Sequence, residues 1–139
     1  DRTHADVVQT LKQLEGMMEL IERHGVDAQA RASAGAICAF FDGAARAHHD
    51  DEERVVFPPL LASGDATLVQ HVQRLQQDHG WIEEDWLAMV PHLQAIAQGE
   101  NWYDPDMLRA AIPVFSSLCR DHIALEESTV YPASRQGRA

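Results

Sequence analysis

The sequence predicts an all-α protein, an up-down antiparallel bundle of four helices. Apolar residues recur at helical spacing along the chain, and no stretch alternates as a half-buried strand would. The connections between the long amphipathic segments are short, so consecutive helices are expected to run antiparallel. With 139 residues and 45% apolar content, a single domain spanning residues 1–139 is expected.

The first two helices are bounded by recognisable start and stop residues. The first is predicted from about His4 to His24, and Gly25 follows in the position where a glycine commonly ends a helix. Asp27 is the predicted N-cap of the second helix. This helix should carry Val55 inward, and Pro58-Pro59 should end or bend it.

The third and fourth helices show the same punctuation. Gly64-Asp65 supplies a loop and an N-cap for the third helix, and Pro91 is expected to kink its last turns. Asp104-Pro105 is an N-cap followed by a proline at the first helical position. The fourth helix should carry Thr129 inward and kink at Pro113.

Three of these helices carry a histidine followed four residues later by a glutamate. With the histidine set at zero on a helical wheel, apolar residues lie within about 40° on both sides, and the glutamate lies at about 40°. On the first helix, a histidine lies at the edge of the apolar stripe. The residues predicted to face the interior are therefore His4, His48, Glu52, His79, Glu83, His122 and Glu126.

Neighbouring titratable residues fall outside the apolar stripe on the same wheels. His49 lies at about 100°, at the rim, and Glu53 and Glu127 lie at about 140°, toward solvent. A local bulge in the helix would turn either glutamate inward instead. The remaining histidines are assigned to the surface or to helix caps: His24, His71 and His92.

The cysteines and aromatic residues are given structural roles. Cys38 and Cys119 form no CxxC pair, and they are interpreted as buried thiols of a cytoplasmic protein. Cys119 lies one turn before His122. It is interpreted as a thiol of the core rather than as a side chain that approaches the site. Phe57 and Tyr131 each precede a proline and are expected to end their helices. The aromatic residues expected to pack are Phe57, Tyr131, Trp81, Trp86 and Trp102.

Glutamates in an apolar interior need a partner, because desolvation costs several kcal/mol per ion. No lysine or arginine lies on the inward arcs near them, so a metal is the simplest answer. Mixed imidazole and carboxylate ligands suit iron, manganese or zinc. Seven ligands are too many for one ordinary site, and carboxylates can bridge two ions. The sequence therefore predicts two metal ions, with iron preferred.

The charge balance excludes some partners. The chain has 11 Lys and Arg against 22 Asp and Glu, a formal net charge of −11, which argues against nucleic acid and anionic membrane. No apolar run approaches the roughly 20 residues of a membrane span. No signal peptide is visible. The chain begins at Asp1, so the question of an upstream segment that carries a further ligand is left open.

Two segments resemble signature segments of the hemerythrin-like family, including its bacterial HHE cation-binding members: HHDDEERVVFPP (His48 to Pro59) and HIALEESTVYP (His122 to Pro132). The resemblance covers nearly the whole chain. It implies a four-helix bundle with two non-haem irons bridged by oxo or carboxylate groups. The implied ligands are His4, His48, Glu52, His79, His122 and either Glu126 or Glu127.

One departure from the family pattern concerns the third helix. The second histidine of its His-x-x-x-His pair is Glu83 here, and if His79 were the second member its partner would be Leu75, which cannot ligate. A carboxylate in place of imidazole adds negative charge and favours ferric iron. Glu83 as a ligand therefore argues against reversible oxygen carriage.

The functional expectation is a di-iron protein that binds or senses oxygen, peroxide, nitric oxide or iron. Glu52 and Glu126 are the candidate bridges, Glu83 is terminal or bridging, and the histidines are terminal ligands. No separate catalytic acid or base stands out. The alternatives are a mononuclear zinc or iron bundle with a regulatory or interaction role, and a structural bundle without metal.

Overall fold

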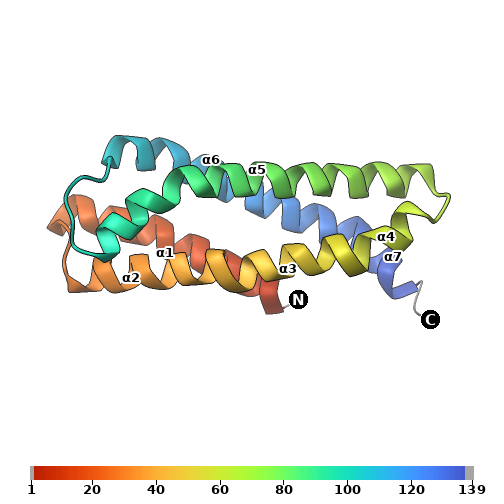
Figure 1. Cartoon of the computed structure of the whole chain (residues 1–139), viewed down its shortest axis with the longest axis horizontal. Helices are drawn as coiled ribbons and strands as arrows, with labels where there is room; N and C mark the ends of the chain where they lie inside the picture. The colour runs from red at the N-terminus through yellow and green to blue at the C-terminus, as the bar shows by residue number, and fades with distance from the viewer. Residues whose placement is uncertain (1, 137–139) are drawn as a thin grey trace.

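The computed structural model describes residues 2–136, in which every regular element is helical, and its four long helical stretches form an up-down antiparallel bundle (Figure 1). The first stretch is α1 (Arg2–His24), and the third is α5 (Ala66–Ala97). The second comprises α2 (Ala28–Phe40), η1 (Phe41–Ala45), α3 (Arg46–Asp51), η2 (Glu52–Val56) and α4 (Phe57–Leu61), where η denotes a π-helical turn. The fourth comprises α6 (Pro105–Leu125), η3 (Glu126–Val130) and α7 (Tyr131–Gln136).

The predicted N-caps, and the glycine predicted to end the first helix, are confirmed. Gly25 follows α1 with a φ of 74°, in the left-handed region that favours glycine. Asp27 caps α2, and its Oδ1 accepts a hydrogen bond from the backbone N–H of Ala30 at 2.8 Å. Asp65 and Asp104 cap α5 and α6 in the same way. These caps fix where each helix begins, and hence which residues lie level with one another across the bundle.

The prolines interrupt the helices less than the sequence predicts. Pro58 and Pro59 lie in the first turn of α4, directly after the π turn η2, and the helix continues to Leu61. Pro91 and Pro113 lie within α5 and α6, which continue past them. Figure 1 shows α5 bending over its last turns, the part that contains Pro91.

The three π turns change which residues face inward. Each π turn holds one residue more than an α turn, so the following residues are displaced by one position on the helical wheel. The prediction for Val55 is therefore wrong: its side chain is 56% exposed, and Val56 packs against the core instead. In the fourth stretch, Val130 is fully buried, while Thr129, the residue predicted to face inward, is half-buried.

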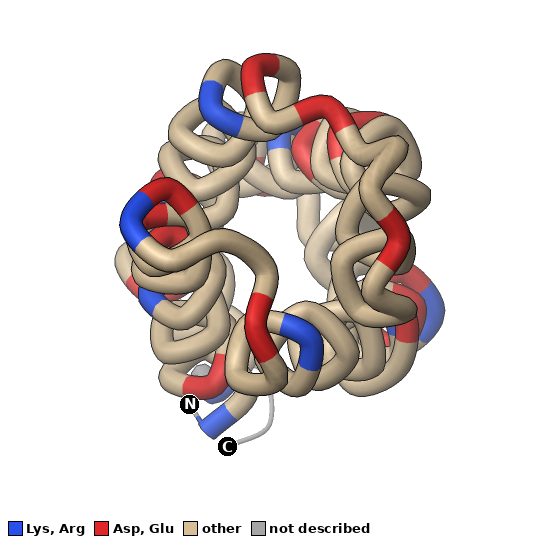
Figure 2. Tube along the Cα trace, turned by 90° about the vertical axis from the view of Figure 1, so that its left-hand side faces the viewer, with Lys and Arg blue, Asp and Glu red and all other residues tan. Residues whose placement is uncertain are grey.

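The helices form a closed ring around a layered interior. Both α1 and α5 pack against α2 and α6, and Figure 2 shows the ring end-on, with acidic positions outnumbering basic ones. A large apolar cluster, which includes Leu14, Trp86 and Phe115, fills one part of the interior. A smaller one, which includes Phe57 and Leu75, fills the other. Between them lies a layer of buried titratable side chains.

The helices are not equally long at the end that holds the smaller cluster. Figure 1 shows α1 beginning level with α3, so α1 does not extend alongside α4 and α7. One side of the titratable layer therefore lies near the start of α1. Among the described residues, no helix combines the length and apolar character needed to cross a membrane.

Candidate metal centre

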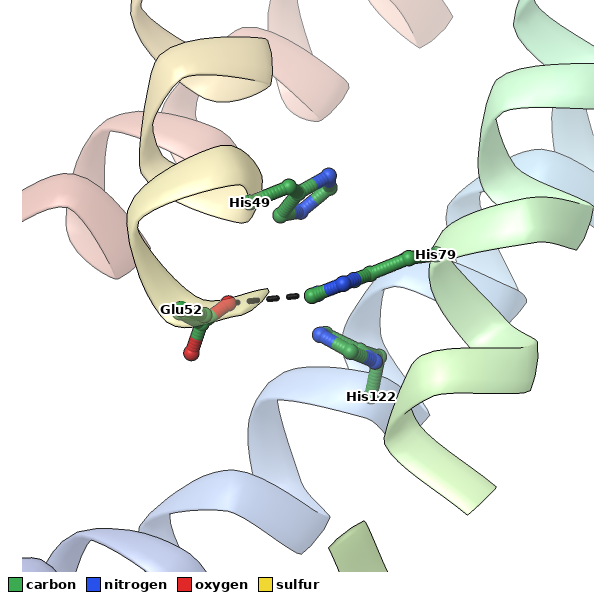
Figure 3. Close-up of side chains that lie close together, drawn as sticks. All are labelled: His49, Glu52, His79 and His122. Atoms are coloured by element: carbon green, nitrogen blue, oxygen red, sulfur yellow. Dashed lines mark hydrogen bonds and ion pairs between the residues drawn. The ribbon is translucent and has the colours of Figure 1, made fainter. Parts of the chain in front are cut away.

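The titratable layer contains two groups of side chains that could hold metal ions, and within each group the potential ligand atoms lie within 4.8 Å of one another. The structure brings together every predicted site residue except Glu83, and it adds His49. The first group is His49, Glu52, His79 and His122, which point toward one another from α3, η2, α5 and α6 (Figure 3). The second group is His4, His48 and Glu126.

Each glutamate lies close to histidines of both groups. Glu126 Oε1 is 2.6 Å from His122 Nε2 and 3.6 Å from His4 Nε2. Glu52 Oε1 is 3.2 Å from His79 Nε2 and 3.8 Å from His48 Nε2. The two carboxylates therefore connect the groups into one centre.

The contact between His122 and Glu126 is not a hydrogen bond, although the atoms are only 2.6 Å apart. His122 Nε2 and both carboxylate oxygens of Glu126 are buried without a hydrogen-bond partner. Buried polar atoms are normally paired, because leaving one unpaired costs about 1–3 kcal/mol or more. Lone pairs that converge without a shared proton are the arrangement a cation would satisfy, so the residues present fit a metal ion.

Three carboxylates hold the far nitrogens of the histidines. Glu127 Oε1 lies 3.1 Å from His4 Nδ1, and Glu53 Oε1 lies 2.9 Å from His79 Nδ1. Asp78 Oδ2 lies 3.3 Å from His122 Nδ1. A carboxylate on one ring nitrogen fixes the tautomer and turns the other nitrogen toward a metal. All three imidazoles are thereby oriented with Nε2 toward the centre.

The sequence did not reveal these three orienting roles. Glu53 and Glu127 remain partly exposed, as expected, with side chains 37% and 53% exposed. Asp78 is only 3% exposed. It also pairs with Arg74 four residues earlier, at 3.1 Å, and such a spacing in sequence usually indicates a surface ion pair.

Glu83 does not face the centre, so this part of the prediction is wrong. Its side chain is 43% exposed, and its Oε1 accepts a hydrogen bond from Arg46 at 2.6 Å. At the edge of the apolar stripe, a long side chain can turn either way, and a cation on the neighbouring helix draws this one outward. Arg46 precedes His48 by two residues, and a single-helix wheel could not show that it reaches Glu83.

His49 lies in the centre, although it was predicted to lie at the rim of the apolar stripe. The π turn η1 lies between the apolar stripe of α2 and His49, and its additional residue rotates His49 inward. The His49 ring stacks on that of His79, with 4.2 Å between centroids. His48 stays at the edge of the centre, with its side chain 22% exposed.

Comparison with known proteins agrees with this geometry. The family described as "Hemerythrin HHE cation binding domain" matches residues 1–134. The chain belongs to this family. An uncharacterized protein of Haemophilus influenzae is 30% identical to the hemerythrin-like chain over 86 residues. That match covers 62% of this chain and 49% of the relative, so the chain spans about half the length of the relative. No solved structure matches the chain significantly.

Three histidines of this hemerythrin-like domain, His48, His49 and His122, are neutral at physiological pH. Burial, and then the neighbouring histidines, lower the pKa of His49 to about 3 and that of His122 to about 2. Burial lowers the pKa of His48 as well. Burial also acts to lower the pKa of His79, but hydrogen bonds to Glu52 and Glu53 outweigh it and raise that pKa. Neutral imidazoles leave a lone pair available for a metal.

These shifts predict how the stability of the metal-free protein depends on pH. The lowered pKa values of His49 and His122 contribute stability that is present above pH 6.5 and lost as the pH falls toward about 3 and about 2. Each contributes at most about 1.4 kcal/mol per pH unit in its window. His79, whose pKa is raised, loses its contribution above pH 6.5 instead. Urea unfolding of chelator-treated protein should therefore show maximal stability near pH 6.5. A stability that stays constant from pH 6.5 to pH 4 would contradict this prediction.

A small cavity of about 20 Å³ adjoins the centre. This volume admits about one water-sized molecule. One wall is formed by His4, His48, His49, His122 and Glu126 from the hemerythrin-like centre, and the other by apolar residues, including Val7, Phe41 and Ile82. Cys119 also lines the cavity. Because burial raises its pKa to about 12, this cysteine is a protonated thiol.

Proposed function

We propose that this chain binds two non-haem iron ions in the centre described above, and that it uses them to bind or sense oxygen, peroxide, nitric oxide or iron. We propose further that residues 1–139 act as one such domain in the cytoplasm. Two free, buried cysteines, Cys38 and Cys119, support a reducing compartment.

The observation that carries the proposal is the position of the two glutamates. Glu52 and Glu126 each lie within 4 Å of a histidine in both groups, where a carboxylate with two oxygens can serve two cations. The donor set of imidazole nitrogens and carboxylate oxygens suits iron. The first group would hold one ion and the second group the other, with the two carboxylates shared between them.

Bound iron would supply open coordination positions and electrons to a small ligand. The chain's own residues would do the rest. The apolar wall of the cavity limits the water that reaches a ligand beside the centre, and its volume restricts that ligand to about the size of one water molecule. Glu53, Asp78 and Glu127 hold three of the imidazoles in a fixed orientation.

The exclusion of Glu83 changes one functional argument. With His49 in its place, the candidate ligands are imidazoles and only two carboxylates. The additional negative charge that disfavoured a return to ferrous iron is therefore absent from the proposed centre. Reversible binding of a small ligand belongs in the proposal alongside sensing.

The second candidate is a mononuclear zinc or iron site with a regulatory or interaction role. The first group alone favours it, because His49, Glu52, His79 and His122 already provide the four ligands of an ordinary tetrahedral zinc site. In that case the second group would remain metal-free.

Metal titration distinguishes the two candidates. Metal-free protein is titrated anaerobically with Fe(II), and separately with Zn(II), and the bound metal per chain is measured after gel filtration. We expect about two irons per chain, and near-ultraviolet charge-transfer bands after exposure to oxygen. One bound zinc, no second metal and no colour with iron would support the mononuclear site. No retained metal of either kind would contradict both candidates.

A further inference from the structure

An open groove reaches the metal centre from solvent beyond the start of α1. Its volume is about 270 Å³, and it lies between α3 and η2 on one side and α7 on the other. His48 lines both this groove and the small inner cavity, so it is a wall common to the two spaces. The groove is lined by His48, Asp51, Glu52, Val56, Tyr131, Ser134 and Arg135.

Tyr131 lies between the groove and the second group of ligands. Its hydroxyl oxygen is 3.0 Å from His4 Nε2, 3.1 Å from His48 Nε2 and 3.4 Å from Glu52 Oε2. Its ring stacks almost parallel on that of His4, with 5.0 Å between centroids. Tyr131 was expected only to pack and to end its helix. Instead it begins α7 and places its hydroxyl among potential ligand atoms.

The hydroxyl contacts atoms that a cation would need. His4 Nδ1 faces the carboxylate of Glu127 and donates to it, so His4 Nε2 carries the lone pair that faces Tyr131. The phenol has one proton to donate and can accept from a second partner. Burial and the nearby carboxylates raise its pKa, so it remains a neutral phenol. A cation approaching the second group from the groove must therefore displace this hydroxyl from its hydrogen bonds.

We propose that the groove is the passage by which metal cations enter and leave the centre, and that the hydroxyl of Tyr131 is its gate. This inference rests on the metal centre proposed above. The groove's own charges agree with a cation passage, since Asp51 and Glu52 line it and, among the described residues, Arg135 is its only basic side chain apart from His48. The inner cavity, in contrast, holds only about one water-sized molecule.

The first test removes the hydroxyl and keeps the ring. Metal-free Tyr131→Phe and wild-type protein are mixed anaerobically with Fe(II), and uptake is stopped at timed intervals with a ferrous chelator. Release from loaded protein is followed with excess chelator. We expect uptake to be faster by about tenfold, the effect of losing one or two hydrogen bonds that only the metal-free protein makes, and the affinity for Fe(II) to rise by a similar factor. Tyr103→Phe, at a tyrosine packed against the larger apolar cluster, is the matched control and should leave both rates unchanged.

The second test obstructs the groove. Ser134→Trp places a large ring in it, and Arg135→Trp does the same from an exposed position that leaves the packing intact. Both variants should slow uptake and release by at least about fivefold. Ser117→Trp, in a separate surface groove on α6, is the matched control. Far-UV circular dichroism and melting of the metal-free variants verify that each is folded.

The outcomes separate this inference from the function on which it depends. If wild-type protein takes up no Fe(II), the proposed function fails. If wild-type protein loads normally but Tyr131→Phe and the groove variants all keep wild-type rates, only the passage is overturned. A Tyr131→Phe variant that loses affinity together with a visible charge-transfer band would make Tyr131 a ligand and would also overturn its role as a gate.

Discussion

A Glu126→Met substitution is expected to stabilise the metal-free protein and, in the same molecule, to reduce its stabilisation by iron. Glu126 is fully buried, and both of its carboxylate oxygens lack a hydrogen-bond partner. Replacing buried ionic groups by apolar side chains of similar volume is often stabilising by about 1–4 kcal/mol. Methionine has nearly the length of glutamate and adapts to irregular cavities. We therefore expect the free energy of unfolding of the metal-free variant to rise by about 1–3 kcal/mol.

With iron present, the order should reverse. A ligand that binds only the folded state stabilises it by about 4 kcal/mol at a concentration one thousand times its dissociation constant. Without Glu126 the second group retains only His4 and His48, so the variant should bind one iron per chain, and its Tm should rise with added Fe(II) by less than that of wild type. Thermal melts of wild type and variant, each with chelator and with iron, measure all four states. Glu84→Met, at an exposed glutamate, is the control and should change stability by no more than about 0.5 kcal/mol.

The prediction has two separable parts. A metal-free Glu126→Met protein that is clearly less stable than wild type would show that the carboxylate has a partner the structure lacks. A variant that still melts at a higher temperature with iron, by the wild-type increment, would remove Glu126 from the ligand set. The combination we expect is that of a functional site whose residues reduce the stability of the fold until their ligand arrives.

Where the helices are regular, the sequence alone predicts the direction of the histidine side chains. His79 and His122 lie on α5 and α6 downstream of uninterrupted α-helical stripes, and both are buried as the wheels predict. His4 is buried near the start of α1, again on a regular helix. In these three cases the periodicity of about 3.6 residues per turn holds from the apolar stripe to the histidine, so the direction of the side chain follows from its position.

Downstream of a π turn, the helical wheels predict the wrong side-chain directions. Past η1, His49 turns inward and Val55 turns out, each displaced from its position on an ideal helix. No residue of the segment Phe41–Ala45 is a proline, and its glycine is not held in a left-handed conformation, so the segment carries no local signal for a bulge. Such a turn is stabilised by what the rotated side chains then contact, which is tertiary information.

The wrong direction predicted for Glu83 and the role missed for Asp78 have another cause, since both residues lie on a regular helix. Their directions are decided by partners on other helices, Arg46 for Glu83 and His122 for Asp78. A wheel ranks directions within one helix, and it contains nothing about which charge a neighbouring helix presents. The sequence therefore gives the class of the site and most of its members, but the last ligand and the orienting carboxylates require the fold.

Substitutions of His49 and Glu83 should change iron binding in the opposite way to that expected from an ideal helical wheel. On the wheel, Glu83 is the ligand and His49 is the rim residue. In the structure, His49 belongs to the first group, while Glu83 is paired with Arg46 at the surface. We expect His49→Leu to lower the affinity of one iron by at least about 100-fold, since even loss of an orienting partner typically costs 10–100-fold.

Glu83→Gln should retain two irons per chain at wild-type affinity. Its only expected cost is the ion pair with Arg46, whose side chains are 37% and 43% exposed, and such pairs contribute about 1 kcal/mol or less. The metal-free stability of His49→Leu should match or exceed that of wild type at neutral pH, because burial keeps His49 uncharged there. A loss of iron therefore cannot be attributed to unfolding.

The measurement is anaerobic Fe(II) titration against a competing chelator, with the same protocol for wild type and both variants. Each variant serves as the other's control, since the two residues lie on facing helices and each has been assigned to the centre by one line of reasoning. If Glu83→Gln loses an iron while His49→Leu keeps both, the centre follows the ideal wheel after all, and metal binding must then reverse the rotation that η1 imposes. If both variants lose iron, Arg46 and Glu83 hold α3 against α5 in the geometry that His49 needs, and the ion pair is part of the site's support rather than of the surface.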